Sequence, residues 1–327
     1  NCPIGVGLWL PNNALQQACK QQLQNTLAKC NAEVFTCNGF PFGDFHSSIV
    51  KHKVYEPDWS TNERLEYTKK LAQFFASITT RNEFGISTLP LGWRTGSFKN
   101  HDCAKTLLHC IDYLEEIEME TGKCIHLDIE AEPGCRLQTS NDVKNFVNTE
   151  FGDNEKVRRY LRVCHDVCHA SIMHESIESC LKNYHDAGLL IGKVQLSSAI
   201  QIDLDAPRSE NEISNVYKLA EQRYLHQTTI KTKEELLFFD DLTEAIEANV
   251  NGLWRIHFHV PIHNKNFGEF GTTQEDLKRS ITQLKDAGVT DWEIETYTWD
   301  VSPKDMKQDN LISSIAKEWM WAQQQIN

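Results

Sequence analysis

Short apolar segments alternate with amphipathic stretches along most of the chain. The apolar segments are "IGVGLWL", "AEVFTCNGF", "FGISTLPLGW", "CIHLDIEAEPG", "RYLRVCHD", "GKVQLSSAIQI", "LWRIHFHVPI" and "DWEIETYTW". Between them, hydrophobic residues recur at helical spacing within residues 62–78, 104–120, 175–187, 240–248 and 273–287. A strand followed by a helix, repeated about eight times, predicts a parallel sheet whose two edges join, which is a (β/α)8 TIM barrel.

The ends of two expected helices carry residues that favour starting or stopping a helix. Thr273 precedes one of them as a candidate N-cap, and Gly288 follows it as a candidate C-terminal glycine. Gly188 ends another helix in the same way. Residues 203–237 are polar and fit the alternation poorly, so we expect an insertion there over one end of the barrel. Because no linker rich in glycine and serine divides the chain, we expect one barrel domain over residues 1–327.

Composition and charge exclude several kinds of partner. The chain has 327 residues, of which 40% are hydrophobic, and this supplies a core large enough for a barrel. Its formal net charge of −13 offers no basic footprint for phosphate groups, so nucleic acid and anionic membranes are poor partners. No apolar run approaches the roughly 20 residues that cross a bilayer. We therefore expect a cytoplasmic protein with no nucleic-acid partner and no membrane insertion.

The cysteines are typical of reduced thiols, because their number, eleven, is odd and their spacing is irregular. The segment "RVCHDVCHAS", residues 162–171, contains two of them. A zinc knuckle needs a second Cys/His pair nearby, and covalent haem attachment needs Cys-x-x-Cys-His, and the segment meets neither requirement. We interpret Cys164 and Cys168 as packing residues, and Asp166 with His169 as the functional pair.

Polar side chains gather where the expected strands end, which is where parallel barrels build their active sites. They are Asp128, Glu130 and Glu132; His165, Asp166 and His169; Gln195; His257, His259 and His263; and Glu293 and Glu295. A buried charge is costly unless it is paired or bound to metal. A single glutamate after a strand is equally consistent with a helix cap or a solvent-exposed side chain. Here several strand ends each carry such polar residues, which favours a shared site. The mixture suits a divalent Zn²⁺, Mn²⁺, Fe²⁺, Co²⁺ or Mg²⁺ ion with positions open for water or substrate.

The order of these residues resembles the xylose-isomerase-like TIM barrels, which include sugar and sugar-phosphate isomerases and epimerases and endonuclease IV. The segments "LDIEAEPGC", "LRVCHDVCHA", "GKVQLSSAI", "YLHQT", "WRIHFHVP" and "IETYTWDV" together resemble one subgroup, the EboE-type metabolite traffic proteins. The segments run from residue 125 to 302. The resemblance implies a TIM barrel that holds a divalent metal and acts on a small hydroxylated or carbonyl metabolite.

The same resemblance implies the metal ligands. Carried over residue by residue, it implies Glu130, Asp166 and Glu295. The remaining donor is left open among Gln195, His257 and His259. Gln195 stands where the superfamily usually has a histidine, and an amide is the weaker ligand. His257 and His259 lie on a following segment, as an additional histidine does in the nuclease branch. Asp128 takes the place of Glu130 if the alignment slips by two residues.

An isomerase or epimerase is the first functional hypothesis. Glu130 and Glu295 would move the proton of a metal-chelated hydroxy-carbonyl substrate, and His169 would reach a substrate oxygen. The expected substrate contacts are Glu132, His226 and Trp299. A metabolite carrier on the same barrel is the alternative, because a fold alone does not determine function. A hydrolase like endonuclease IV is the weaker alternative, because the acidic charge opposes binding to DNA.

Overall fold

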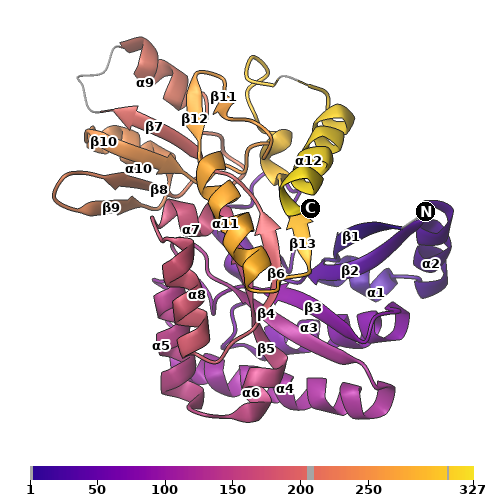
Figure 1. Cartoon of the computed structure of the whole chain (residues 1–327). Helices are drawn as coiled ribbons and strands as arrows, with labels where there is room; N and C mark the ends of the chain where they lie inside the picture. The colour runs from indigo at the N-terminus through magenta and orange to yellow at the C-terminus, as the bar shows by residue number, and fades with distance from the viewer. Residues whose placement is uncertain (1–2, 205–209, 308) are drawn as a thin grey trace. The chain divides into compact units, whose positions relative to one another are not determined.

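The computed structural model describes residues 3–204, 210–307 and 309–327 (Figure 1). The chain divides into two compact units. The first unit comprises Asn1–His46, His52–His165 and Leu181–Lys193, and the second comprises Ser47–Lys51, Asp166–Cys180 and Val194–Asn327. In the part of the chain that the structure describes, every helix is too short or too polar to cross a bilayer.

Seven strands form one parallel sheet in the order β1-β2-β3-β4-β5-β6-β13. Their bounds are β1 (Ile4–Trp9), β2 (Ala32–Asn38), β3 (Glu83–Thr88), β4 (Cys124–Glu130), β5 (Leu161–Asp166), β6 (Ile191–Leu196) and β13 (Trp292–Ile294). Strands β3, β4 and β5 are buried along most of their length, and β4 is buried at every position. This burial explains why these strands appear in the sequence as nearly continuous apolar runs.

Helices connect the strands of the first unit. They are α1 (Asn12–Gln17), α2 (Lys20–Lys29), α3 (Asn62–Ile78), α4 (Asn100–Thr121), α5 (Ser140–Phe151), α6 (Glu155–Tyr160) and α8 (Ile177–Asp186), together with the 3-10 turn η1 (Lys51–Tyr55). Helix α3 begins where the pattern predicts because the Thr61 side chain accepts a hydrogen bond from the Arg64 N–H. Its apolar face packs on the sheet, and the Phe75 ring stacks on Phe84 of β3 at 4.9 Å between centroids.

A buried hydrogen-bonded pair lies inside the first unit. His126 Nδ1 is 2.6 Å from Asp128 Oδ1, and both residues are at most 2% exposed. The neighbouring strands make room for this pair with glycines: a Cβ at Gly192 would lie 2.1 Å from Asp128 Oδ1, and one at Gly85 would lie 2.3 Å from Oδ2. Asp128, the alternative to Glu130 as a ligand, is therefore held by His126.

The second unit contains a six-stranded sheet in the order β11-β12-β7-β10-β8-β9, with antiparallel pairing. Its strands are β7 (Ile200–Leu204), β8 (Thr228–Lys231), β9 (Leu236–Phe239), β10 (Gly252–Ile256), β11 (Asn266–Phe267) and β12 (Phe270–Thr272). Its helices are α7 (Val167–Ile172), α9 (Glu210–Tyr217), α10 (Leu242–Ala248), α11 (Gln274–Asp286) and α12 (Leu311–Ile326), and η2 (Tyr297–Trp299) is a 3-10 turn. Trp254, Ile256 and Phe258 lie at the centre of its hydrophobic core.

The structure of the second unit differs from three predictions made from the sequence. The pattern assigns "LWRIHFHVPI" to the barrel, whereas β10 pairs antiparallel with β7 and β8, so the parallel sheet has seven strands instead of eight. An apolar run has the same composition in either kind of sheet, so periodicity does not reveal the direction of pairing. The sequence predicts an insertion at residues 203–237, but the antiparallel sheet extends past residue 237 to β12. Residues 205–209 of the expected insertion lie outside the described chain.

The third change concerns the start of α11. Thr273 precedes this helix as predicted, but its hydroxyl does not cap it and accepts a hydrogen bond from the Ala199 N–H at 2.9 Å instead. The predicted ends of two helices are confirmed, because Gly288 and Gly188 have φ angles of +82° and +66°. A left-handed residue after the last turn is the usual C-terminal signal of a helix.

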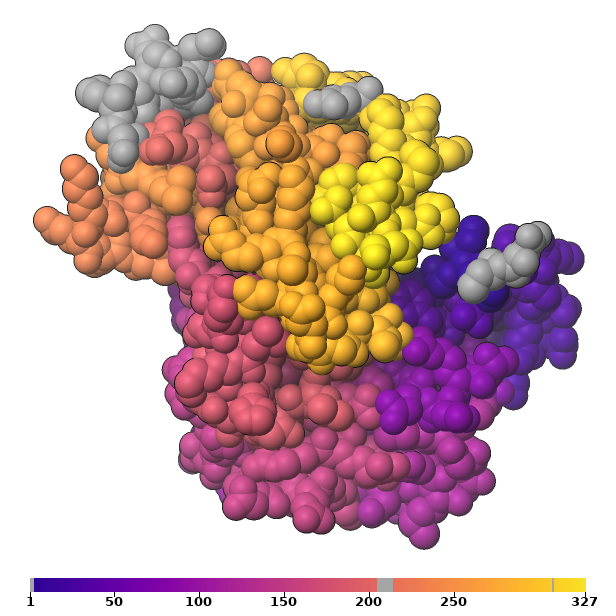
Figure 2. Space-filling view, viewed as in Figure 1, coloured from indigo at the N-terminus to yellow at the C-terminus, as the bar shows by residue number. Residues whose placement is uncertain are grey.

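Helix α12 holds together the two loops that follow β10 and β13. Glu318 is buried on its inner face, and its Oε1 accepts hydrogen bonds from the Ile262 N–H at 3.1 Å and the Thr296 hydroxyl at 2.6 Å. The other face of α12 is exposed, with Ile312 82% and Trp319 48% accessible, and Figure 2 shows this helix in yellow at the surface. The position of the two loops matters because they carry candidate ligands.

Candidate metal centre

Asp166 and His169 lie where β5 gives way to α7. The Asp166 side chain caps α7: its Oδ1 accepts hydrogen bonds from the His169 N–H at 2.8 Å and the Ser197 hydroxyl at 2.9 Å. Its Oδ2 is buried and has no hydrogen-bond partner among the described residues. The Asp-x-x-His spacing is thus an N-cap that fixes one carboxylate oxygen and leaves the other available for a cation.

Electrostatics keep this carboxyl ionised. Burial alone would raise the pKa of Asp166, but the nearby His169 imidazole and the hydrogen bonds from the His169 N–H and the Ser197 hydroxyl hold its pKa below the ordinary value. A buried, ionised carboxylate oxygen without a donor is costly unless a positive charge compensates it. Oδ2 of Asp166 is therefore a good metal ligand.

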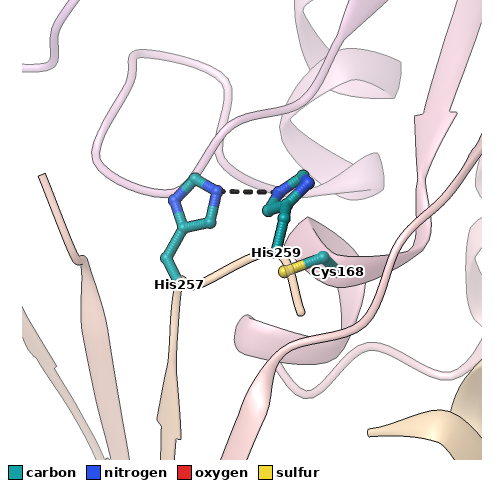
Figure 3. A group of neighbouring side chains, drawn as sticks. All are labelled: Cys168, His257 and His259. Carbon is teal, nitrogen blue, oxygen red and sulfur yellow. Dashed lines mark hydrogen bonds between the residues drawn. The ribbon is translucent and has the colours of Figure 1, made fainter. Parts of the chain in front are cut away.

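Two histidines that follow β10 approach each other closely. The Nδ1–H of His259 donates to the Glu295 carbonyl oxygen at 3.0 Å, and the Nδ1–H of His257 donates to the Gln227 side-chain oxygen at 2.7 Å. A neutral imidazole carries one hydrogen, so these bonds leave a lone pair on each Nε2. The two Nε2 atoms lie 3.1 Å apart, the approach drawn as a dashed line in Figure 3.

Both rings are neutral at physiological pH. Burial lowers the pKa of His259 to about 4 and that of His257 well below its ordinary value. His169 Nε2 is also 3.1 Å from His257 Nε2, and the Tyr297 hydroxyl lies 3.4 Å from the same atom. Neutral imidazoles gathered in this way are the form in which histidine binds a metal ion.

The separation of the two nitrogens fits a shared metal ion. Two nitrogens bonded to one Zn²⁺ at about 2.0 to 2.1 Å with a tetrahedral angle lie roughly 3.3 Å apart, close to the observed 3.1 Å. Asp166, His169 and His259 each offer a ligand atom within 4.8 Å of the others. Hydrogen bonds from the Nδ1 atoms to carbonyl oxygens are also how proteins orient metal-binding histidines. The donor set therefore fits a divalent metal.

Two further predicted ligands lie at strand ends of the second unit. Gln195 is fully buried in β6, in register with Glu293 of β13. Glu295 follows β13, where its N–H donates to the Leu196 carbonyl oxygen at 3.1 Å. The Glu295 side chain is 21% exposed, with Oε2 3.9 Å from Nδ1 of His259. Glu295 therefore serves the site twice, through a backbone acceptor and through a carboxylate that solvent reaches.

Two other predicted residues belong to the first unit. Glu130 ends β4, is 3% exposed and lies in register with Cys164. Glu132 follows it, and its Oε1 accepts a hydrogen bond from the Tyr55 hydroxyl at 2.9 Å. The Tyr55 ring in turn lies 4.8 Å from the Trp93 ring. Both carboxylates are thus buried at the end of β4, and their roles as ligand and substrate contact stay predictions.

The remaining predicted substrate contacts have protein partners. Both ring nitrogens of His226 are engaged, Nδ1 with the His257 carbonyl oxygen at 2.8 Å and Nε2 with Glu221 Oε1 at 3.1 Å. The Trp299 ring lies beneath Lys307, whose Nζ is 4.1 Å from the ring centroid. His226 therefore supports the backbone at His257, and substrate binding by either residue stays a prediction.

Sequence reasoning missed two residues of this site. Gln227 orients His257, and it reaches this position only because β8 pairs antiparallel with β10, which the pattern did not reveal. Cys168 packs with Ile172 and Ala199, as the sequence predicts, and its sulfur also lies within 4.8 Å of ligand atoms of His257 and His259. The one available signal for Cys168 was its place between Asp166 and His169.

Replacing Gln227 by leucine is expected to weaken metal binding by about 10 to 100-fold, because His257 loses the acceptor that sets its tautomer. Titration calorimetry with Zn²⁺ on chelator-treated protein measures the change. The matched control is Thr229→Val, two residues later in β8, which removes the buried hydrogen bond from the Thr229 hydroxyl to the Ile172 carbonyl oxygen. Equal affinities for the two variants would contradict the orienting role.

No protein-family model and no curated protein matches the sequence. Solved structures do match. A xylose isomerase-like TIM barrel protein from Mycobacterium smegmatis in complex with magnesium is 10% identical, with a TM-score of 0.52 over 99% of this chain and 84% of that one. An L-ribulose 3-epimerase is 10% identical, with a TM-score of 0.50 over 100% of this chain and 95% of that one. The chain has the fold of the xylose isomerase-like TIM barrels.

The predicted fold class is thereby confirmed. A third structure, the IOLI protein with a bound zinc atom, is 14% identical, with a TM-score of 0.48 over 96% of this chain and 84% of that one. At these identities the likeness is one of fold, so the chemistry has to be argued from the residues of this chain.

Proposed function

We propose that this chain is a metal-dependent isomerase or epimerase of a small hydroxy-carbonyl metabolite. The observation that carries the proposal is the convergence of three imidazoles with the Asp166 carboxylate in the second unit. The fold supports it, because an L-ribulose 3-epimerase shares that fold. The resemblance to EboE-type proteins adds a biological context, the traffic of small metabolites.

Asp166, His257 and His259 are proposed to hold the metal, with His169 next to them. From the resemblance, Glu130, Gln195 and Glu295 are proposed as further oxygen donors. Imidazole nitrogens favour Zn²⁺, Fe²⁺ or Co²⁺, whereas Mg²⁺ prefers an all-oxygen site. When bound, such an ion acidifies the C–H bond between adjacent hydroxyl and carbonyl oxygens and stabilises the enediolate charge.

The chain must also move a proton. Glu295 is suited to this because its carboxylate is partly exposed next to the histidines. We propose that one carboxylate takes the proton from the substrate carbon and that the other returns it. Glu130 and Glu295 are the two candidates. Return to the neighbouring carbon isomerises the substrate, and return to the opposite face of the same carbon epimerises it. His169, Glu132, His226 and Trp299 are proposed to contact the substrate.

The first test is metal content by elemental mass spectrometry. Near-stoichiometric Zn²⁺, Fe²⁺ or Co²⁺ is expected in purified protein, and His259→Ala should lose it while circular dichroism stays unchanged. Absence of metal from the wild type, even after incubation with each ion, would overturn the metal centre.

The second test is proton exchange. A panel of ketoses and aldoses is incubated with the loaded protein in D₂O, and deuterium incorporation is followed by NMR. Glu295→Gln and Glu130→Gln are expected to lower the exchange rate by about 10² to 10⁴-fold. Glu275→Gln on the exposed face of α11 is the control. Stoichiometric sugar binding without exchange would replace the isomerase by a metabolite carrier.

A further inference from the structure

Cys168 occupies an unusual position for a packing residue. It lies in the first turn of α7, between the Asp166 cap and His169. Its N–H donates to the Ser197 hydroxyl at 2.8 Å, so the backbone that carries the thiol is fixed by the same serine that binds Asp166. Figure 3 shows the side chain reaching from α7 toward His257 and His259. Sγ and one ligand atom of each histidine lie within 4.8 Å of one another.

We propose that Cys168 binds the metal through its thiolate, so that the centre is a mixed sulfur and nitrogen site. This inference rests on the proposed metal centre and assigns one more ligand to it. A zinc ion binds sulfur at about 2.3 Å and imidazole nitrogen at about 2.0 Å. Cys168 Sγ and the two histidine nitrogens, which lie within 4.8 Å of one another, are therefore close enough to share one ion. On binding, the S–H bond breaks, the metal–sulfur bond forms and the proton leaves to the solvent.

The residues around Cys168 hold it in place. The Arg255 side chain interacts electrostatically with Cys168. Its guanidinium donates to the Ser171 carbonyl oxygen at 2.6 Å and forms an ion pair with Asp276 at 2.7 Å. Cys168 also packs with Ile172 and Ala199. These contacts fix the position of Cys168 beside the two histidines.

Cys164, four residues earlier, provides the contrast. It is equally buried but lies in the first unit, in register with Glu130. Within the described ranges, Cys164 belongs to no group of three candidate ligands, whereas Cys168 does. A thiolate in the set would shift the metal preference further toward Zn²⁺, Co²⁺ and Fe²⁺ and away from Mg²⁺ and Mn²⁺.

Substitution with Co²⁺ tests the inference without any assay of activity. Full-length protein is freed of metal and titrated with Co²⁺ under reducing, oxygen-free conditions, and absorbance is recorded in the near ultraviolet and visible regions. A thiolate-to-cobalt charge-transfer band is expected to saturate together with the visible d–d bands. Cys168→Ser should lose the charge-transfer band and keep the d–d bands, and Cys164→Ser should keep both.

The outcomes separate the two proposals. Stoichiometric Co²⁺ with d–d bands but no charge-transfer band in the wild type overturns the thiolate ligand and leaves the histidine centre standing. A charge-transfer band that survives in Cys168→Ser and disappears in Cys164→Ser also overturns it. If the wild type binds no Co²⁺ or Zn²⁺, the metal centre itself is wrong. If Cys168→Ser does not fold, the wild-type and Cys164→Ser spectra decide: a charge-transfer band present in both supports Cys168, and a band lost in Cys164→Ser or absent from the wild type overturns the proposal.

Discussion

Replacing Gly192 by alanine is expected to destabilise the first unit by about 3 to 5 kcal/mol. The added Cβ would lie 2.1 Å from Asp128 Oδ1 and 2.4 Å from its Cγ. The aspartate cannot move aside without leaving its hydrogen bond to His126, and leaving a buried carboxylate without its partner is itself expensive. Urea unfolding followed by circular dichroism measures the loss.

Gly43→Ala is the matched control, because a Cβ there meets no atom within 4 Å. Its stability should stay within about 0.5 kcal/mol of the wild type. In a protein that already carries Asp128→Ala, Gly192→Ala should lower the free energy of unfolding by less than it does in the wild type, because the clashing carboxylate is absent. If Gly192→Ala is as stable as Gly43→Ala, the carboxylate of Asp128 does not pack against β6.

Local sequence signals determined the parts of the fold that could be predicted. Helix α3 has the predicted bounds of Asn62–Ile78 because a capping threonine and a helical apolar period agree there. Strand β4 ends at Glu130, as the change from apolar to charged residues indicates. The direction of β10 was not predictable, because pairing depends on residues more than twenty positions away, as in the contact of Trp254 with Ile230.

The same limit applies to the site. Asp166, His169, His257 and His259 could be found from residue type and position at strand ends, and the structure brings these four side chains together. The hydrogen-bond partners of these side chains could not be predicted from the sequence. The tautomer of His259 depends on a carbonyl oxygen 36 residues away, and carbonyl groups have no sequence signature.

Asp166→Asn is expected to lower metal affinity by about 100-fold or more, because loss of an outer partner of a ligand alone costs about 10 to 100-fold. The reason is the difference between the two carboxylate oxygens. Oδ1 accepts hydrogen bonds from the His169 N–H and the Ser197 hydroxyl, and an asparagine oxygen can keep both. Oδ2, which lacks a hydrogen-bond partner among the described residues, becomes an NH₂ group that cannot bind a cation.

The metal-free protein should respond much more weakly. Without metal, the lowered pKa of Asp166 means that the folded state favours the ionised carboxylate, so Asp166→Asn should lower the free energy of unfolding slightly while it retains the cap. Asp166→Ala loses the cap as well and should cost about 1 kcal/mol or more. Calorimetric Zn²⁺ titration and urea unfolding of the chelator-treated variants separate the two roles. If Asp166→Asn binds Zn²⁺ like the wild type, the histidines hold the metal without this carboxylate.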